Sequence, residues 1–183
     1  FDVKYYDLNI KVNPEQKTIS GYNDIYFAAT EAGKVMQIDL FENMQADSIL
    51  YGGKKLNYER KFNAVFITFP DGVNPAGSLQ KIRFYYSGAP TVARRPPWDG
   101  GFVWTKDQQD NPFIGVACQG TGASLWWPNK DHQSDEPDSM RLSCAVPNNL
   151  QCIANGQNKG TTNEGDYTRY HWFVSYPINN YGV

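Results

Sequence analysis

The sequence predicts an all-β fold, a β-sandwich or a related architecture, and its 183 residues suit one domain. Apolar and polar residues alternate with a period of two along much of the chain, as strands with one buried face require. Turn residues such as Gly, Pro, Asn and Asp recur at a spacing of roughly ten residues, which is typical of sandwiches. No apolar stripe of helical period has a convincing length, and only residues 122–127 could form a single helical turn.

The first half of the chain carries the clearest strand patterns. Leu8, Ile10 and Val12 alternate with polar residues, and the alternation resumes after a turn at 13–16 and continues to Phe27, which predicts a β-hairpin. Further strands are expected at 35–40, 45–51, 54–60, 65–69 and 79–86. Residues 52–53 form a turn, and residues 70–72 and 74–75 are expected to close the strand at 65–69.

In the second half the alternation is interrupted twice. Residues 91–109 and 119–139 are rich in Pro, Gly and polar residues without a period, which indicates long loops. A short apolar run lies within the first loop, at 102–104, and another lies between the two loops, at 113–116. Strands are expected again at 141–146, 151–155 and 167–175, and residues 156–166 are interpreted as a polar turn.

The charge balance excludes several classes of partner. The chain has 17 Lys and Arg against 19 Asp and Glu, a net charge of −2, whereas proteins that bind nucleic acid or anionic membranes carry a basic surplus. No apolar stretch is long enough to span a bilayer. The chain opens at Phe1 without an initiator methionine, as after removal of a signal peptide or in a piece of a longer protein, and we expect a periplasmic or secreted location.

Three cysteines, Cys118, Cys144 and Cys152, form no Cys-x-x-Cys motif, so a zinc ribbon or a thioredoxin-type site is excluded. Buried free thiols are one interpretation, because cysteine is among the most buried residue types. A disulfide between Cys144 and Cys152 is the other, and it requires that the two residues face each other across a hairpin.

Candidate catalytic groups are few. His132 lies with four carboxylates within residues 129–138, a set of types that could bind a divalent cation, but the spacing matches no metal-binding loop and favours a solvated acidic loop. His171 lies in an expected strand. Residues 120–124 contain glycines and hydroxyls, yet they match neither a Gly-x-Ser-x-Gly nucleophile motif nor a phosphate-binding loop. These residues alone indicate a non-catalytic module.

Tryptophans suggest one binding hypothesis. Trp98, Trp104, Trp126 and Trp127 all lie in or beside the irregular middle of the chain. Tryptophans on the loops of a β-sandwich could stack on sugar rings and make the chain a carbohydrate-binding module. The alternative is that they pack beneath the long loops as a satellite hydrophobic cluster. A purely structural or adhesive module is a third possibility.

The order of several segments resembles the aminopeptidase N family of zinc metallopeptidases, the gluzincin aminopeptidases that include leukotriene hydrolase-type enzymes. No single segment is specific, but their order over the whole chain is. The segments are Tyr5-Tyr6-Asp7-Leu8-Asn9-Ile10, Ile19-Ser20-Gly21, Ile67-Thr68-Phe69-Pro70, the stretch 82–88 that ends in Tyr86-Ser87-Gly88, Cys118-Gln119, Pro128, Asp135-Glu136-Pro137, Ala145-Val146-Pro147, Ala154-Asn155-Gly156, and 176–183, which is similar to the family's closing strand.

The resemblance implies a fold and a setting. Residues 1–183 would form the saddle-shaped antiparallel β-sandwich that lies N-terminal to a thermolysin-like catalytic domain. The Gly-x-Met-Glu-Asn and His-Glu-x-x-His motifs of that domain are absent from this sequence. Accordingly, we expect no catalytic residue, metal ligand or cofactor in this chain, zinc in the catalytic domain of the parent enzyme, and two partners: that catalytic domain and the N-terminus of a peptide substrate.

One site residue is implied by position within the family motif. Gln119 matches the family's Glu or Gln that reaches into the active site and helps to bind the free α-amino group of the substrate, and an amide oxygen can accept hydrogen bonds from an ammonium group. Gly120 and Ala123 are expected to line the same pocket. The chain differs from the family in having no Arg between Ala123 and Pro128, extra residues around 130–134, and Ala117 in place of Gln, which indicates a divergent branch.

Overall fold

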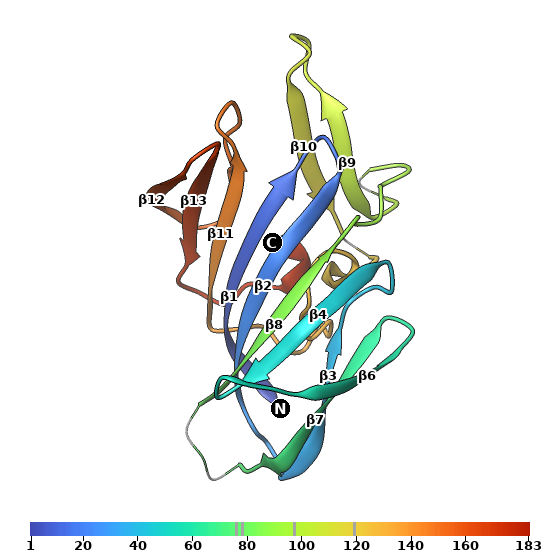
Figure 1. Ribbon diagram of the computed structural model, residues 1–183, viewed down its shortest axis with the longest axis vertical. Helices are drawn as coiled ribbons and strands as arrows, with labels where there is room; N and C mark the ends of the chain where they lie inside the picture. The colour runs from blue at the N-terminus through green and yellow to red at the C-terminus, as the bar shows by residue number, and fades with distance from the viewer. Residues whose placement is uncertain (76, 78, 97, 119) are drawn as a thin grey trace.

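The computed structural model describes residues 1–75, 77, 79–96, 98–118 and 120–183. In this part of the chain nearly all regular structure is β, arranged in three sheets (Figure 1). The eight-stranded sheet has the order β12 (Gln157–Glu164), β13 (Tyr167–Val174), β11 (Ser139–Pro147), β1 (Asp2–Asn13), β2 (Thr18–Ala28), β8 (Gln80–Gly88), β4 (Met44–Tyr51) and β5 (Lys54–Lys55).

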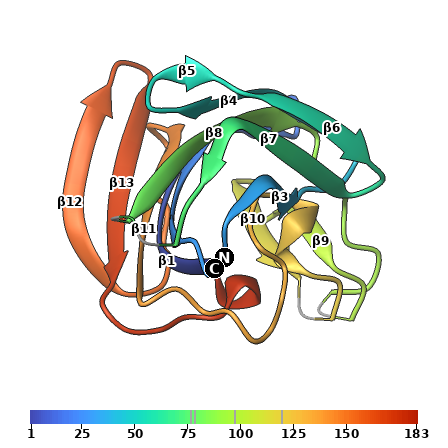
Figure 2. The ribbon, with the colours of Figure 1, turned by 90° about the horizontal axis from the view of Figure 1, so that it is seen from below.

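The two smaller sheets and two helical turns complete the described structure. One sheet has the order β3 (Gly33–Asp39), β7 (Ala64–Val73) and β6 (Asn57–Lys61), and the other is the hairpin of β9 (Gly101–Lys106) and β10 (Pro112–Ala117). The 3₁₀ turns are η1 (Ala123–Leu125) and η2 (Asn180–Gly182). Figure 2 shows the large sheet curving around the smaller elements. The all-β prediction is confirmed, and η1 lies within residues 122–127, where a helical turn was expected. The turn η2 was not expected.

The expected hairpin at the start of the chain forms the centre of the large sheet. β1 and β2 pair antiparallel along their length, and Leu8, Ile10 and Val12 are buried on one face, as their alternation predicts. β1 pairs on its other side with β11 in parallel, the one departure from antiparallel pairing between the described strands. A parallel pair needs a long crossover, and here residues 14–138 provide it.

The core lies between the large sheet and the smaller elements. Its largest fully buried side chains come from sequence-distant regions. They include Tyr6, Leu8, Ile25 and Phe27 of the β1–β2 hairpin, Phe84 and Tyr86 of β8, Ile38 and Phe69 of the three-stranded sheet, and Trp127 of the segment after η1. Tyr6 and Trp127 meet edge to face with their ring centroids 5.0 Å apart. The irregular middle of the chain is therefore anchored in the core.

One expected strand and one expected turn are wrong in the last third of the chain. Residues 151–155 form no strand, and the strand β12 occupies 157–164, where a polar turn was expected. All residues of β12 are exposed, so the strand has no buried face to leave a period of two in the sequence. Its backbone pairs with β13 at the edge of the sheet, and this pairing is independent of side-chain type.

Two chain segments near turns also differ from expectation. Residues 70–72 and 74–75 were expected to close a strand; β7 continues through 70–72 and ends at Val73, directly before the second of these signals. The β3–β7 pairing shifts in register between Val35–Thr68 and Gly33–Val73, so the strand passes Pro70 in an irregular stretch. Residues 176–183 were expected to form a closing strand and instead contain η2. Asn180 is buried there and bonds to the segment 129–131 rather than to a neighbouring strand.

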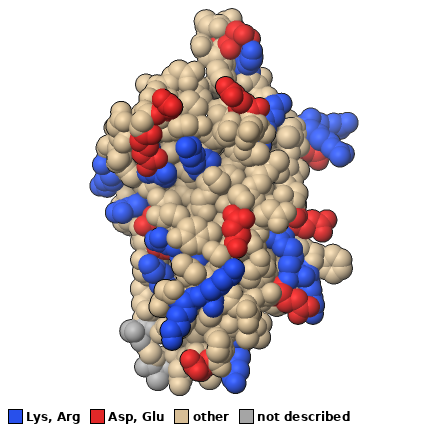
Figure 3. Space-filling view, in the orientation of Figure 1, with Lys and Arg blue, Asp and Glu red and all other residues tan. Residues whose placement is uncertain are grey.

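Acidic and basic side chains are interspersed on the face of the molecule shown in Figure 3. That face therefore presents no extended patch of a single sign. In the described part of the chain, no helix has the length and apolar character needed to cross a membrane.

Gly21 tests the close approach of β1 and β2. A Cβ atom at this position would lie 1.9 Å from the carbonyl oxygen of Asn9, a backbone atom that cannot move aside without shifting the strand. We expect Gly21→Ala to lower the free energy of unfolding by about 3 kcal/mol in denaturant titrations. Gly33→Ala, where a Cβ would meet no atom within 4 Å, is the control and should change it little. Equal midpoints for the two variants would contradict this interpretation.

Candidate functional site

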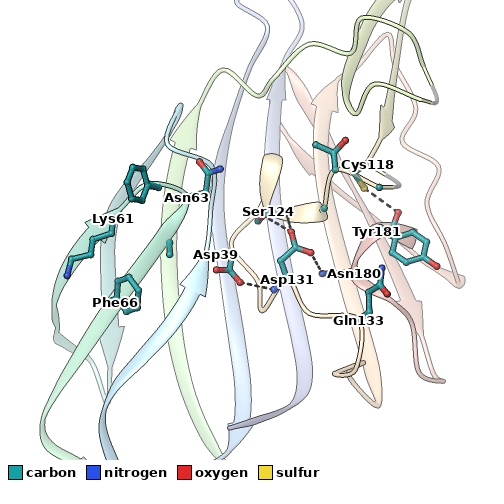
Figure 4. A pocket seen from close by; sticks show the side chains of 15 residues that line it. Asp39, Lys61, Asn63, Phe66, Cys118, Ser124, Asp131, Gln133, Asn180 and Tyr181 are labelled. Atoms are coloured by element: carbon teal, nitrogen blue, oxygen red, sulfur yellow. Dashed lines mark hydrogen bonds between the residues drawn. The ribbon is translucent and has the colours of Figure 1, made fainter.

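A concave surface encloses a cavity of about 680 Å³ between the three-stranded sheet and the irregular segment that follows β10 (Figure 4). One wall comes from β3 and the β6–β7 turn, and the other from the segment 118–133 and from η2. The residues that line it are Asp39, Lys61, Phe62, Asn63, Ala64, Phe66, Cys118, Gly120, Thr121, Gly122, Ser124, Asp131, Gln133, Asn180 and Tyr181. The site thus combines residues from four separate parts of the sequence.

The Asp131 carboxylate is the main polar junction of this surface. Its Oδ2 accepts hydrogen bonds from Ser124 N at 3.1 Å and Ser124 Oγ at 2.6 Å, and its Oδ1 accepts one from Asn180 Nδ2 at 2.7 Å (Figure 4). Gly122 permits this approach, because a Cβ there would lie 2.2 Å from Asp131 Oδ2 and the residue has a φ of 97°. One carboxylate therefore joins η1, the following loop and η2.

Asp39 links the same junction to the three-stranded sheet. The backbones of Asp39 and Asn129 form a two-way bridge, with N···O distances of 2.8 and 3.2 Å. The Asp39 carboxylate accepts one hydrogen bond from Gln37 Nε2 at 2.7 Å and another from Asp131 N at 3.0 Å. The end of β3 and the loop 129–131 are consequently held as one rigid wall.

The two aspartates give the concave surface a negative character. Within the described residues, neither Asp39 nor Asp131 takes part in an ion pair; the donors to both are backbone, hydroxyl and amide groups. Lys61 also lines the surface, but its Nζ lies 3.5 Å from Glu59. Two carboxylates held by neutral donors favour a ligand that carries a positive charge, such as an ammonium group.

The three predicted site residues have different positions relative to this surface. Gly120 lines it, with a φ of 80° and open space around the position of a Cβ. Ala123 is fully buried in η1 and is not one of the lining residues. Gln119 lies outside the described residues.

Sequence reasoning missed the polar residues that build the surface. Asp39 ends an ordinary strand and Asn180 lies in a segment expected to be a strand, so neither carried a local signal. Asp131 was noted only as one acid among several in the loop 129–138. The turn that presents Gly120 did have a local signal in its two glycines, and it is closed by Gly122 N donating to Cys118 O at 2.9 Å.

The tryptophan hypothesis is largely contradicted by burial. Trp126 and Trp127 are buried, with exposed fractions of 2% and 0%, so they cannot offer a face to a sugar. Trp104 is half-buried and stacks on Phe102 with a centroid distance of 5.2 Å. Trp98 alone of the four is fully accessible, at 85%. Packing beneath loops, the alternative interpretation, is correct for the buried pair.

The loop with His132 forms its own local contacts. Lys130 Nζ pairs with the Asp135 carboxylate, and His132 Nδ1 bonds to the Ser134 hydroxyl at 2.7 Å. His171 lies in β13, as expected, between the hydroxyls of Ser143 and Thr162, each 2.9 Å from a ring nitrogen. Across the residues that the structure describes, no three His, Cys, Asp or Glu side chains gather closely enough to hold a metal ion.

Comparison with known proteins gives matches in structure and none in sequence. No protein-family model matches the chain, and no curated protein matches it. An M1 zinc metallopeptidase from Deinococcus radiodurans superposes on 98% of this chain with a TM-score of 0.79 and 19% identity, and native yeast LTA4 hydrolase does so with a TM-score of 0.71 and 14% identity. A structure of the Deinococcus enzyme with a Tyr-Ser-Ala substrate gives a TM-score of 0.78 and 21% identity.

These similarities define the fold: the chain has the all-β architecture found within M1 zinc metallopeptidases. It spans only part of them, 40% of the Deinococcus enzyme and 27% of the yeast enzyme. The saddle-shaped sandwich implied by the motif order is thus confirmed at the level of the fold.

The Asp131 junction can be tested by mutation. Asp131→Ala removes the acceptor of three hydrogen bonds and leaves the Ser124 N–H and the Asn180 amide without it, so we expect the free energy of unfolding to fall by about 3 kcal/mol. Gln133→Ala, an exposed residue of the same surface, is the control and should change it by less than about 0.5 kcal/mol. Denaturant titrations followed by tryptophan fluorescence measure both, and equal values would remove Asp131 from its junction role.

Proposed function

We propose that residues 1–183 form the N-terminal domain of a zinc-dependent aminopeptidase, an enzyme that removes N-terminal residues from peptides. The observation that carries the proposal is the superposition of 98% of this chain on M1 zinc metallopeptidases, in which it accounts for 40% of the chain. In this proposal the domain caps the active site and performs no catalysis of its own. The chemistry belongs to a catalytic domain beyond this chain.

The concave surface supports a role in recognising an amino terminus. Its two aspartates carry negative charge without a basic partner among the described residues, and Gly120 leaves open space at its rim. A peptide presents a positive α-ammonium group, which a surface of this sign attracts. The structure of the Deinococcus enzyme with Tyr-Ser-Ala shows that a protein of this fold binds a peptide substrate.

Gln119 is the residue we assign to direct contact with the substrate. It directly precedes Gly120 in the sequence, and its amide oxygen can accept a hydrogen bond from the α-ammonium group. Gly120 would leave room for the substrate beside it. Ala123 would support the site without touching the substrate. It lies buried in η1 directly before Ser124, which is the hydrogen-bond partner of Asp131.

Zinc would be held outside this chain. A catalytic zinc site needs three protein ligands and a water molecule in fixed geometry. The proteins that share this fold are zinc metallopeptidases of which this chain spans only a part, and the proposal assigns the ion to the catalytic domain of the parent enzyme. When bound there, zinc would activate water for attack on the peptide bond.

The first test is metal content. We expect the chain of residues 1–183, purified after exposure to zinc and dialysis, to contain far less than one zinc per molecule, and to have no activity on aminoacyl substrates. The full-length protein treated in the same way should retain about one zinc per catalytic domain. Atomic absorption measures both. Stoichiometric zinc in the 183-residue chain would overturn the proposal that the zinc site lies in the catalytic domain.

The second test addresses Gln119 in the full-length enzyme. Gln119→Ala should lower kcat/KM for peptides with a free α-amino group by roughly 10- to 100-fold, the scale of one hydrogen bond to a charged group. Gln45→Ala, an exposed glutamine on β4, is the matched control and should leave the kinetics unchanged. Unchanged kinetics for Gln119→Ala would remove this residue from the substrate site.

A further inference from the structure

A second cavity, of about 420 Å³, lies apart from the proposed substrate surface. It is bounded by the β9–β10 hairpin, by β1 and β11, and by the segment that follows β11. Its walls are largely apolar, with Phe102, Ile114 and Trp126 among the lining residues, and they include two cysteines, Cys144 and Cys152. The proposed aminopeptidase function makes no use of these two thiols.

The two thiols lie at the wall of the same cavity. Cys144 lies on β11 and is buried, with 4% of its surface exposed, whereas Cys152 is half-buried on the following segment. Both are free cysteines. The chain therefore turns back after β11 in such a way that two residues eight positions apart meet at the cavity wall.

Side chains of β13 fix the position of the segment that carries Cys152. Tyr170, the ladder partner of Cys144, donates its hydroxyl to Leu150 O at 3.3 Å. Trp172 Nε1 donates to Cys152 O at 3.2 Å. These two bonds fix the backbone on both sides of Gln151 against the sheet. The pairing of the thiols is thus built into the fold rather than dependent on a mobile loop.

The third cysteine provides an internal comparison. Cys118 is buried, and its thiol donates to the backbone carbonyl of Tyr181 at 3.3 Å. Burial raises the pKa of the Cys118 thiol to about 11. A buried, protonated thiol is a poor nucleophile, so Cys118 should remain unreactive under conditions in which an accessible thiol pair reacts.

We propose that Cys144 and Cys152 form a dithiol–disulfide pair that exchanges with low-molecular-weight disulfides of the oxidised-glutathione type. The thiolate of Cys152 attacks one sulfur of the external disulfide, which forms a mixed disulfide and releases one thiolate. The thiolate of Cys144 then attacks the Cys152 sulfur, which forms the Cys144–Cys152 bond and releases the second thiolate. The two protons from the protein thiols end on the two released small thiols, so the protein is oxidised by two electrons and the small disulfide is reduced by two.

The environments of the two cysteines decide the order of the steps. Interaction with the Cys144 thiol lowers the pKa of the Cys152 thiol, and the same interaction together with burial raises the pKa of Cys144. Cys152 is also the more accessible of the two. Cys152 is therefore the attacking thiol and Cys144 the resolving one. The new bond would tie the segment after β11 to that strand at the cavity wall.

Peptide mass spectrometry tests the proposal directly. Trypsin cuts after Arg141 and Lys159, so both cysteines fall in the single peptide 142–159. After exposure to oxidised glutathione and alkylation, this peptide should be lighter than its reduced form by about 2 Da and carry no alkyl group, whereas reduction with dithiothreitol should restore two alkylation sites. A protein isolated with this disulfide already present supports the proposal equally. Cys118 should show no change.

Two variants separate exchange from chance oxidation. In Cys144→Ala the resolving thiol is absent, so Cys152 should accumulate a stable glutathione adduct that the wild-type protein does not retain. In Cys152→Ser the buried Cys144 should form no adduct. If Cys144→Ala does not fold, the wild-type peptide mass still decides the question. A wild-type protein that keeps the adduct on Cys152, or that keeps both thiols alkylatable, overturns the proposal.

The proposal is independent of the proposed aminopeptidase function. Its readouts are peptide masses within residues 142–159, and none of them depends on zinc, on substrate or on Gln119. A protein without peptidase activity could contain the disulfide pair, and an active peptidase could lack it.

Discussion

The backbone bridge between Asp39 and Asn129 is the contact on which the rest of the site depends. It joins the end of β3 to a loop that is ninety residues away in the sequence, with N···O distances of 2.8 and 3.2 Å. Asn129 is fully buried, so its polar groups need protein partners, and its side chain finds them in Trp127 O at 2.8 Å and Asn180 Nδ2 at 3.0 Å. Once this bridge forms, Asp131 comes within reach of Ser124 and Asn180.

The segment that carries this polar junction is also packed into the hydrophobic core. Trp127 is fully buried and packs edge to face on Tyr6, while the hydroxyl of Tyr6 accepts a hydrogen bond from Lys130 N at 3.1 Å. The segment 123–131 has no regular secondary structure beyond one 3₁₀ turn, and these contacts with β1 and β3 fix its position. Asp131 and Ser124 of the concave surface are thereby held in a defined geometry.

The negative surface and the thiol cavity are separate parts of the fold. The concave surface is lined by β3, η1 and η2, whereas the thiol pair lies on the other part of the fold, beside β1, β11 and the β9–β10 hairpin. Both cavities include residues of the segment that follows β10. Trp126 lines the thiol cavity, while Ser124, two residues earlier, lines the negative surface.

The sequence by itself determined those elements whose information is local. The β1–β2 hairpin, the turn at Gly52-Gly53 and the helical turn near 123 follow from a period of two or from turn residues within short windows. The apolar runs at 102–104 and 113–116 were visible as well, but their pairing as β9 and β10 was not predicted. The family resemblance, read from the order of short motifs, agrees with the fold of M1 zinc metallopeptidases although identity to them is about 20%.

Tertiary structure alone decided the features that depend on partners far apart in the chain. β12 is polar on both faces, so only its pairing with β13 makes it a strand. Trp126 and Trp127 belong to the core rather than to a sugar-binding loop because the sheets close over them. One site brings together Asp39, Asp131 and Asn180, and one cavity wall brings together Cys144 and Cys152. Hydrogen bonds and packing between different segments set these positions. Such contacts leave no periodic signal in a single sequence.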